Sequence, residues 1–191
     1  TDGELISSHS LLDVMDPHFM GQSFHEPFWD MEFPNVEGGT KDWSHGNSIG
    51  IDPTDGDMVI SLLTQAFVVK LDRETGALVW RLGEGGDFEL ATGGRWSAGQ
   101  HSASADSEGR ILIYDNKPAS EPHDSRAVEY TLDTTNWVAT QTWEYQETPA
   151  VQVMNMGEVH RLENGNILIV DSTINSIDTD DFNDPNNHTW G

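Results

Sequence analysis

The sequence of 191 residues contains no cysteine and few basic residues, and each shortage excludes a class of protein. Without cysteine the chain can form no disulfide and no thiolate metal site, and no thiol can act as a nucleophile. Only 9 Lys and Arg stand against 33 Asp and Glu, which gives a formal net charge of −24. A surface this acidic repels phosphate backbones and anionic membranes, which argues against nucleic acid as a partner.

Long apolar runs are also missing from the sequence. No stretch approaches the roughly 18 apolar residues that a membrane span needs, so we expect no membrane insertion. The opening residues, TDGELISSHS, have neither the basic nor the apolar region of a signal peptide. Hydrophobic residues make up 36% of the chain, but 7 Trp and 7 Phe supply large apolar surfaces, which favours a packed domain over disorder.

The acidic excess has two interpretations. Salt-adapted proteins carry solvated carboxylate surfaces of this kind. Calcium binding is the second, because two acidic turns could supply oxygen ligands, although neither fits an EF-hand loop. These turns contain Asp52, Asp55 and Asp57 in the first case and Asp178, Asp180, Asp181, Asn183 and Asp184 in the second.

A turn glycine followed by an apolar strand occurs three times, which indicates a repeat. The three copies are residues 56–60, 109–113 and 165–169. A short strand-like stretch precedes each copy. β-Branched segments separated by turn residues follow, at residues 67–71, 78–82, 127–132 and 138–145. Each unit is therefore expected to contain about four strands, with few helices anywhere.

Units of this size are typical of the four-stranded antiparallel blades of an all-β propeller. We expect residues 1–10 to hold the last strand of a preceding blade and residues 11–41 to be an inter-blade insertion that could cover one mouth. Blades are expected at residues 42–84 and 100–145, with the start of a further blade at 156–191. Propellers have 4 to 8 blades, so the chain is expected to be a partial propeller, completed by further chain segments or by self-association. A sandwich of short strands is the alternative.

Two units begin with a histidine at the entry to their innermost strand, and these strands line the axial channel of a propeller. Aligned on the turn residues Asp52 and Asp106, His45 and His101 fall on the same side by strand alternation, which predicts that both face one pocket. Asn47 matches His101 in register. Trp43 and Ser102 adjoin these positions and are predicted, with Asn47, to contact substrate.

His160 and Arg126 are further candidates. His160 also opens a unit, but its position has the opposite strand parity. Arg126 is one of the few cations and precedes an apolar strand. An anion-binding pocket in so acidic a protein needs local positive charge, and a guanidinium supplies a fixed fork of donors. A salt bridge to a nearby carboxylate is the alternative role for Arg126.

Several segments, in order, resemble the core of bacterial arylsulfotransferases. They are Asp42-Trp-Ser-His45-Gly-Asn47-Ser48-Ile49, Ile60-Ser61, Lys70-Leu-Asp72-Arg-Glu-Thr-Gly76, Trp80-Arg-Leu-Gly83, Gln100-His101, Tyr114-Asp115-Asn116, Ser125-Arg126-Ala-Val-Glu-Tyr130, Trp143-Glu-Tyr145 and Arg161-Leu-Glu-Asn-Gly-Asn166. Together they cover most of residues 42–170.

The resemblance implies a six-bladed, periplasmic or extracellular propeller. Such enzymes move a sulfuryl group from an aryl sulfate to a phenol through a sulfohistidine and need no metal or nucleotide cofactor. By motif, His45 and His101 match two histidines of the family, and Arg126 matches its arginine. His160 is the nearest candidate for the nucleophile by order along the chain, although related sequences often have Gln there.

Two other functions remain open at this stage. A secreted binding or assembly propeller would keep the fold without the chemistry. A metal site built from His45, His101 and His160 is the third option, since neutral imidazoles suit zinc or copper.

Overall fold

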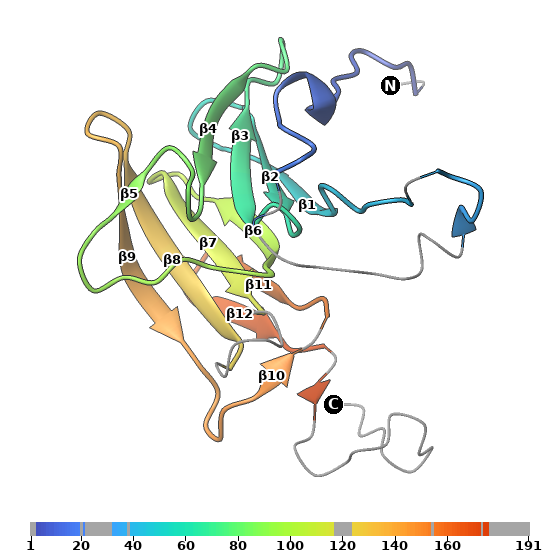
Figure 1. Cartoon of the computed structure of the whole chain (residues 1–191). Helices are drawn as coiled ribbons and strands as arrows, with labels where there is room; N and C mark the ends of the chain where they lie inside the picture. The colour runs from blue at the N-terminus through green and yellow to red at the C-terminus, as the bar shows by residue number, and fades with distance from the viewer. Residues whose placement is uncertain are drawn as a thin grey trace.

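A computed structural model describes residues 3–19, 21, 32–37, 39–116, 124–153, 155–172 and 174–175 of the chain. These residues form β-sheets that follow one another along the molecule (Figure 1). η1 (Leu11–Asp13) is a single turn of 3-10 helix, and the described residues contain no helix with the length and hydropathy of a membrane span. The expectation of an all-β protein is therefore confirmed.

The first sheet is an antiparallel meander in the order β1-β2-β3-β4. β3 is buried along its whole length, and all of its residues except Lys70 are apolar. The turn before β4 begins at Asp72, whose side chain accepts a hydrogen bond from the Thr75 backbone N–H (2.7 Å). The turn ends at Gly76, whose φ of +74° favours glycine. The strands are β1 (Gly46–Ile51), β2 (Met58–Leu62), β3 (Phe67–Leu71) and β4 (Leu78–Leu82).

The second sheet contains another antiparallel meander, β6-β7-β8-β9, and its order is β5-β9-β8-β7-β6. The short strand β5 is added in parallel to the edge strand β9. The strands are β5 (Glu89–Leu90), β6 (His101–Ala105), β7 (Arg110–Asp115), β8 (Arg126–Asp133) and β9 (Val138–Tyr145).

Two strand pairs follow the second sheet. β11 (Glu158–Arg161) and β12 (Ile167–Val170) form an antiparallel hairpin, and β10 (Gln152–Val153) pairs with β13 (Ile174–Asn175). Within the described part of the chain, the sheets do not close into a ring.

The strands can be compared with the expected units. The two meanders lie within the ranges 42–84 and 100–145, and the β11–β12 hairpin lies within 156–191. Residues 3–10 are described but belong to no strand, so the expected strand of a preceding unit stays a prediction. This segment instead contacts the β3–β4 turn, where His9 Nε2 lies 3.2 Å from the Arg73 carbonyl oxygen.

Apolar side chains fill the spaces on both sides of each meander. Val59, Val68 and Trp80 of the first sheet pack against Ile113 and Tyr130 of the second. The opposite face of the second sheet packs on the hairpin through a cluster that includes Leu112, Tyr114 and Val159. The outer face of the first sheet is covered by the segment around η1, through Leu11 and Met15. The successive sheets are therefore stacked by continuous apolar layers.

Serine side chains join the first strands of neighbouring sheets. Ser48 Oγ of β1 accepts a hydrogen bond from the Ala103 backbone N–H of β6 (2.9 Å). Ser102 Oγ of β6 likewise accepts from the Val159 backbone N–H of β11 (3.2 Å). The two serines hold matching positions before the turn residues Asp52 and Asp106, so the same contact links both pairs of neighbours.

Candidate functional site

His45 lies directly before β1 and is bound to Asp42 through two contacts. Its backbone N–H donates to Asp42 Oδ1 (3.1 Å), and its ring Nδ1 lies 2.5 Å from Asp42 Oδ2. The backbone of His45 has φ +43°, a left-handed conformation that is uncommon for a residue other than glycine. The carboxylate of Asp42 thus holds both the main chain and the half-buried ring of this histidine.

His101 is the first residue of β6, and its ring contacts Asn116, just beyond the end of β7. Its Nδ1 lies 2.8 Å from Asn116 Oδ1. Burial lowers the pKa of His101, and positive charge on His45 lowers it further, whereas hydrogen bonds to Asn116 and the Gly99 backbone oppose these effects. The net result is a pKa below the ordinary value of 6.5, which favours a neutral ring at pH 7.

His45 and His101 therefore interact electrostatically across the packed strands β1 and β6. Strand alternation alone does not explain this proximity. His45 precedes β1, and the register of β1 is interrupted between Gly46 and Ser48. A second interruption lies between His101 and Ala103 of β6. Such bulges change the side to which a side chain points, so counting alternate residues along the strand does not fix the direction of the His45 side chain. The two contacts with Asp42 hold it.

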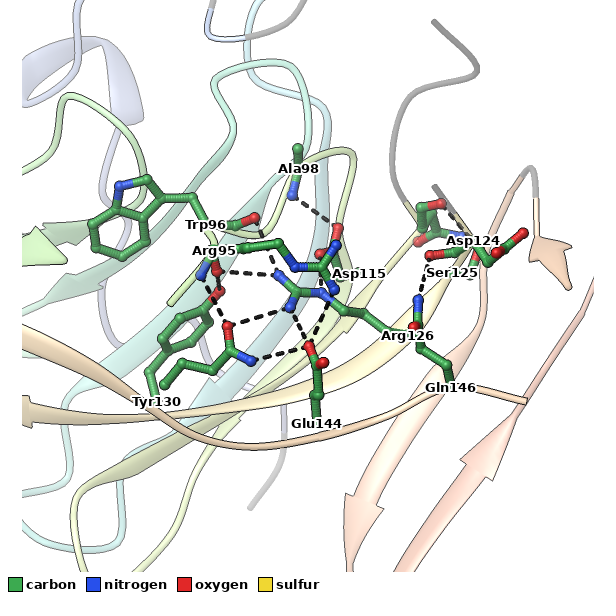
Figure 2. Close-up of polar contacts among 12 residues, drawn as sticks. Arg95, Trp96, Ala98, Asp115, Asp124, Ser125, Arg126, Tyr130, Glu144 and Gln146 are labelled. Carbon is green, nitrogen blue, oxygen red and sulfur yellow. Dashed lines mark hydrogen bonds and ion pairs between the residues drawn. The ribbon is translucent and has the colours of Figure 1, made fainter. Parts of the chain in front are cut away.

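Arg126 lies in a different environment from the two histidines. Its side chain is fully buried, and each of its guanidinium nitrogens donates to groups of the protein (Figure 2). Nε donates to Asp115 Oδ2 (2.8 Å), Nη1 to Glu144 Oε2 (2.6 Å) and Gln141 Oε1 (3.3 Å), and Nη2 to the carbonyl oxygens of Arg95 (3.1 Å) and Trp96 (3.2 Å). A guanidinium has five N–H donors, and five acceptors surround this one. This geometry favours the salt-bridge role over anion binding.

His160 lies on β11, on the side away from the second sheet. Its neighbours Val159 and Arg161 contact that sheet, Val159 in the apolar layer and Arg161 through Glu129. The His160 ring is half exposed and pairs with Glu158 (3.1 Å). Nothing in this geometry joins His160 to the other two histidines.

The three predicted substrate contacts join packed elements. Asn47 donates from Nδ2 to the Gln100 carbonyl oxygen (2.8 Å), next to His101. Ser102 makes the contact with β11 described above. Trp43 packs against the apolar layer on the outer face of the first sheet. Ser102 thus follows His101 in the chain, and Asn47 reaches its other neighbour, Gln100. The substrate roles of Asn47, Ser102 and Trp43 stay predictions.

The first acidic turn already holds a cation from the protein itself. Lys70 Nζ donates to Asp52 Oδ2 (2.6 Å) and to Asp55 Oδ2 (2.5 Å). A calcium ion at Asp52 and Asp55 would have to displace this ammonium. The second acidic turn, Asp178 to Asp184, lies outside the described residues. Within the described ranges, no three His, Asp or Glu side chains are arranged to hold a metal ion.

An open groove of about 570 Å³ is lined by residues of the second sheet and of the β11–β12 hairpin. None of the predicted site residues lines it. Its guanidinium groups are compensated, because Arg161 pairs with Glu129 and Arg110 pairs with Asp106 (2.7 Å). The lining residues are Arg110, Glu129, Trp143, Tyr145, Glu147, Arg161, Gly165, Ile167 and Ile169.

Comparison with known families now adds to this geometry. The family model described as Arylsulfotransferase (ASST) matches residues 1–188, nearly the whole chain. The chain belongs to the arylsulfotransferase family. A comparison with curated proteins gives no match. The resemblance inferred from the motifs around His45, His101 and Arg126 is therefore confirmed at the level of the family, whose activity implies aryl sulfate and phenol as substrates.

Two residues of this candidate site were not singled out from the sequence. Asp42 and Asn116 both lie within the motifs that resemble the family, and they are the polar partners of the two histidine rings. The spacing in Asp42-Trp-Ser-His45 could have indicated the first contact, because a carboxylate often bonds a backbone N–H a few residues later. The Asn116 contact bridges strands and has no comparable local signal.

Proposed function

We propose that this arylsulfotransferase family member transfers a sulfuryl group from an aryl sulfate to a phenolic acceptor, with His45 and His101 at the reacting site. The observation that carries the proposal is the pair of anchored imidazoles, one held by Asp42 and one by Asn116, at the packed strands β1 and β6, which Asn47 joins through the Gln100 carbonyl. Membership of the family supplies the reaction class.

The reaction takes place in two balanced steps. In the first, a neutral histidine nitrogen attacks the sulfur of the aryl sulfate, an N–S bond forms and the S–O bond to the aryl group breaks. The departing phenolate accepts a proton from a neighbouring imidazole. In the second, the acceptor phenol loses its proton to a neutral imidazole of the site, and its oxygen attacks the sulfur as the N–S bond breaks. Because phenols have a pKa near 10, imidazole is a suitable proton donor and acceptor for this exchange.

The test measures transfer and the covalent intermediate separately. The protein is incubated with 4-nitrophenyl sulfate, and nitrophenol release is followed with and without phenol. Mass spectrometry of peptides from a reaction without acceptor then maps any sulfated residue among the 8 histidines. We expect phenol-dependent release and a sulfohistidine. Absence of both would refute the proposal, and the mapped position identifies the histidine that carries the sulfuryl group, His160 included.

We also propose that the two meanders and the hairpin are successive blades of a propeller, six-bladed by the family resemblance. The repeated serine contact supports this, because Ser48 to Ala103 and Ser102 to Val159 relate neighbouring units in the same way. Applying one relation repeatedly generates a closed ring or an open superhelix. Further chain segments or a second copy would complete the ring, and we propose a periplasmic or extracellular location. Small-angle scattering and sedimentation of the intact protein distinguish a closed disc from an elongated stack.

A non-catalytic binding propeller is the second candidate. It is favoured by one observation, the complete use of the Arg126 donors inside the protein. The His101→Ala variant separates the two functions. Sulfuryl transfer should fall steeply with this change if the site is catalytic, whereas a binding protein should keep its partner.

A further inference from the structure

Asp42 and Asn116 present different chemistry to the two histidines, and this difference carries an inference that rests on the proposed function. Asp42 offers a carboxylate, which lies 2.5 Å from Nδ1 of His45. Asn116 offers a neutral amide to Nδ1 of His101. The two rings therefore have chemically different partners although both are imidazoles.

The orientation of the Asn116 amide is determined by two backbone carbonyls. Its Nδ2 donates to the carbonyl oxygens of Val153 (3.1 Å) and Met156 (2.7 Å). An amide nitrogen must face these acceptors, so Oδ1 must face His101. An amide oxygen accepts hydrogen bonds only, hence Nδ1 of His101 carries a proton and donates it. In the neutral ring the lone pair then lies on Nε2.

We propose that Asp42 and Asn116 are positioning residues of the sulfuryl-transfer site, Asp42 holding His45 as the proton donor and Asn116 holding His101 as the Nδ1–H tautomer whose Nε2 accepts protons. This division supplies the acid that the departing phenolate needs and the base that the acceptor phenol needs. The proton that His45 loses and the proton that His101 gains are exchanged with water between turnovers.

Other charges near His101 are compensated within the protein. β6 packs against β1, β2, β7 and β11. His45, which precedes β1, is the titratable group whose charge acts on His101. The ionisable groups of β7 and β11 are paired, Arg110 with Asp106, Tyr114 with Asp171, Asp115 with Arg126, Glu158 with His160 and Arg161 with Glu129. β1 and β2 contain no ionisable side chain.

The experiment uses the full chain and compares Asp42→Asn and Asn116→Asp with wild type in 4-nitrophenyl sulfate to phenol transfer. Asp42→Asn keeps the shape and removes the charge, so kcat should fall about 10²-fold with little change in KM. Asn116→Asp places a carboxylate against His101 and favours its protonated form. The acid limb of the kcat/KM profile should then move up by about 1 to 3 pH units.

Controls and a second readout separate positioning from folding. Asp133→Asn and Asn164→Asp make the same chemical changes in exposed turns, where the side chains accept bonds from nearby backbone N–H groups. Both controls should keep the wild-type profile. Long-range proton–nitrogen NMR correlation of the histidine rings should show the Nδ1–H tautomer for His101 in wild type and a mixture in Asn116→Ala.

The outcomes distinguish the two levels of the proposal. A wild-type protein that transfers no sulfuryl group refutes the proposed function and this inference together. An active wild type whose Asp42→Asn variant keeps its kcat and pH profile overturns the inference alone, as does an Nε2–H tautomer at His101.

Discussion

Replacement of Arg126 by Met should destabilise the protein strongly, because Arg126 compensates a carboxylate that has no access to solvent. The side chains of Arg126 and Asp115 are both fully buried. Burial lowers the pKa of Arg126, but the charge and the hydrogen bond of Asp115 act in the opposite direction. The net result is a raised pKa for Arg126. The Met side chain fills a similar volume but provides no donor, so a buried charge loses its main cationic partner.

The expected magnitude follows from the burial of each contact. Removing one partner of a buried ion pair costs about 3–5 kcal/mol of unfolding free energy. Glu144 is 39% exposed, so its contact with Arg126 adds at most about 1 kcal/mol. A total near 4 kcal/mol lowers the melting temperature of a chain of this length by roughly 8–16 °C.

Urea unfolding followed by circular dichroism measures this loss. Arg73→Met is the matched control, because Arg73 is exposed and its replacement should change stability by less than about 0.5 kcal/mol. The double variant Arg126→Met, Asp115→Asn removes the uncompensated charge and should recover part of the loss. An Arg126→Met protein with wild-type stability and no transfer activity would contradict the reasoning, because it would assign Arg126 to the substrate.

Three further predictions follow from the described contacts. Lys70→Met should cost about 3 kcal/mol of unfolding free energy in urea titrations, because buried Asp52 loses its ammonium partner; a change below about 1 kcal/mol would count against this. Because the pKa of His101 in the folded protein is lowered from 6.5, the unfolded chain binds more protons than the folded protein once the pH falls below about 6.5. Wild-type stability should therefore fall as pH drops from about 6.5 toward the folded pKa, and His101→Gln should reduce that slope in unfolding experiments across this window. Gly157→Ala should cost at least about 2 kcal/mol in thermal unfolding, because Gly157 has φ +98° and an added Cβ would lie 2.4 Å from the Tyr114 ring; an unchanged melting temperature would contradict that geometry.

Much of the strand layout was predictable from local sequence. The turn glycines Gly56, Gly109 and Gly165 all have positive φ, and the apolar runs after them form β2, β7 and β12. Period-two patterning and turn residues act over a few residues, so they can be read without knowledge of the tertiary structure. The two-residue strand β5 has no such pattern, and its parallel pairing with β9 depends on the packing of a distant segment.

The candidate site was predictable only in part, because its residues interact over long distances in sequence. His45 and His101 were identified from their motifs, yet their partners decide what each ring can do. Lys70 reaches Asp52 across the sheet, and Arg126 is surrounded by groups from three segments. In so acidic a chain, each basic side chain can be expected to pair with a carboxylate. The sequence does not indicate that Arg126 is the one whose guanidinium nitrogens all donate to groups within the protein.

The tautomer of His101 also links the chemistry to the stacking of the sheets. Asn116 takes its orientation from the carbonyls of Val153 and Met156, which belong to the segment between the second sheet and the β11–β12 hairpin. If that segment moved away, the amide could turn and His101 could exchange its proton between Nδ1 and Nε2. The packing of this segment on the second sheet therefore determines which ring nitrogen of His101 carries the proton. This explains how a site formed at the start of one sheet can depend on residues that make no contact with its imidazoles.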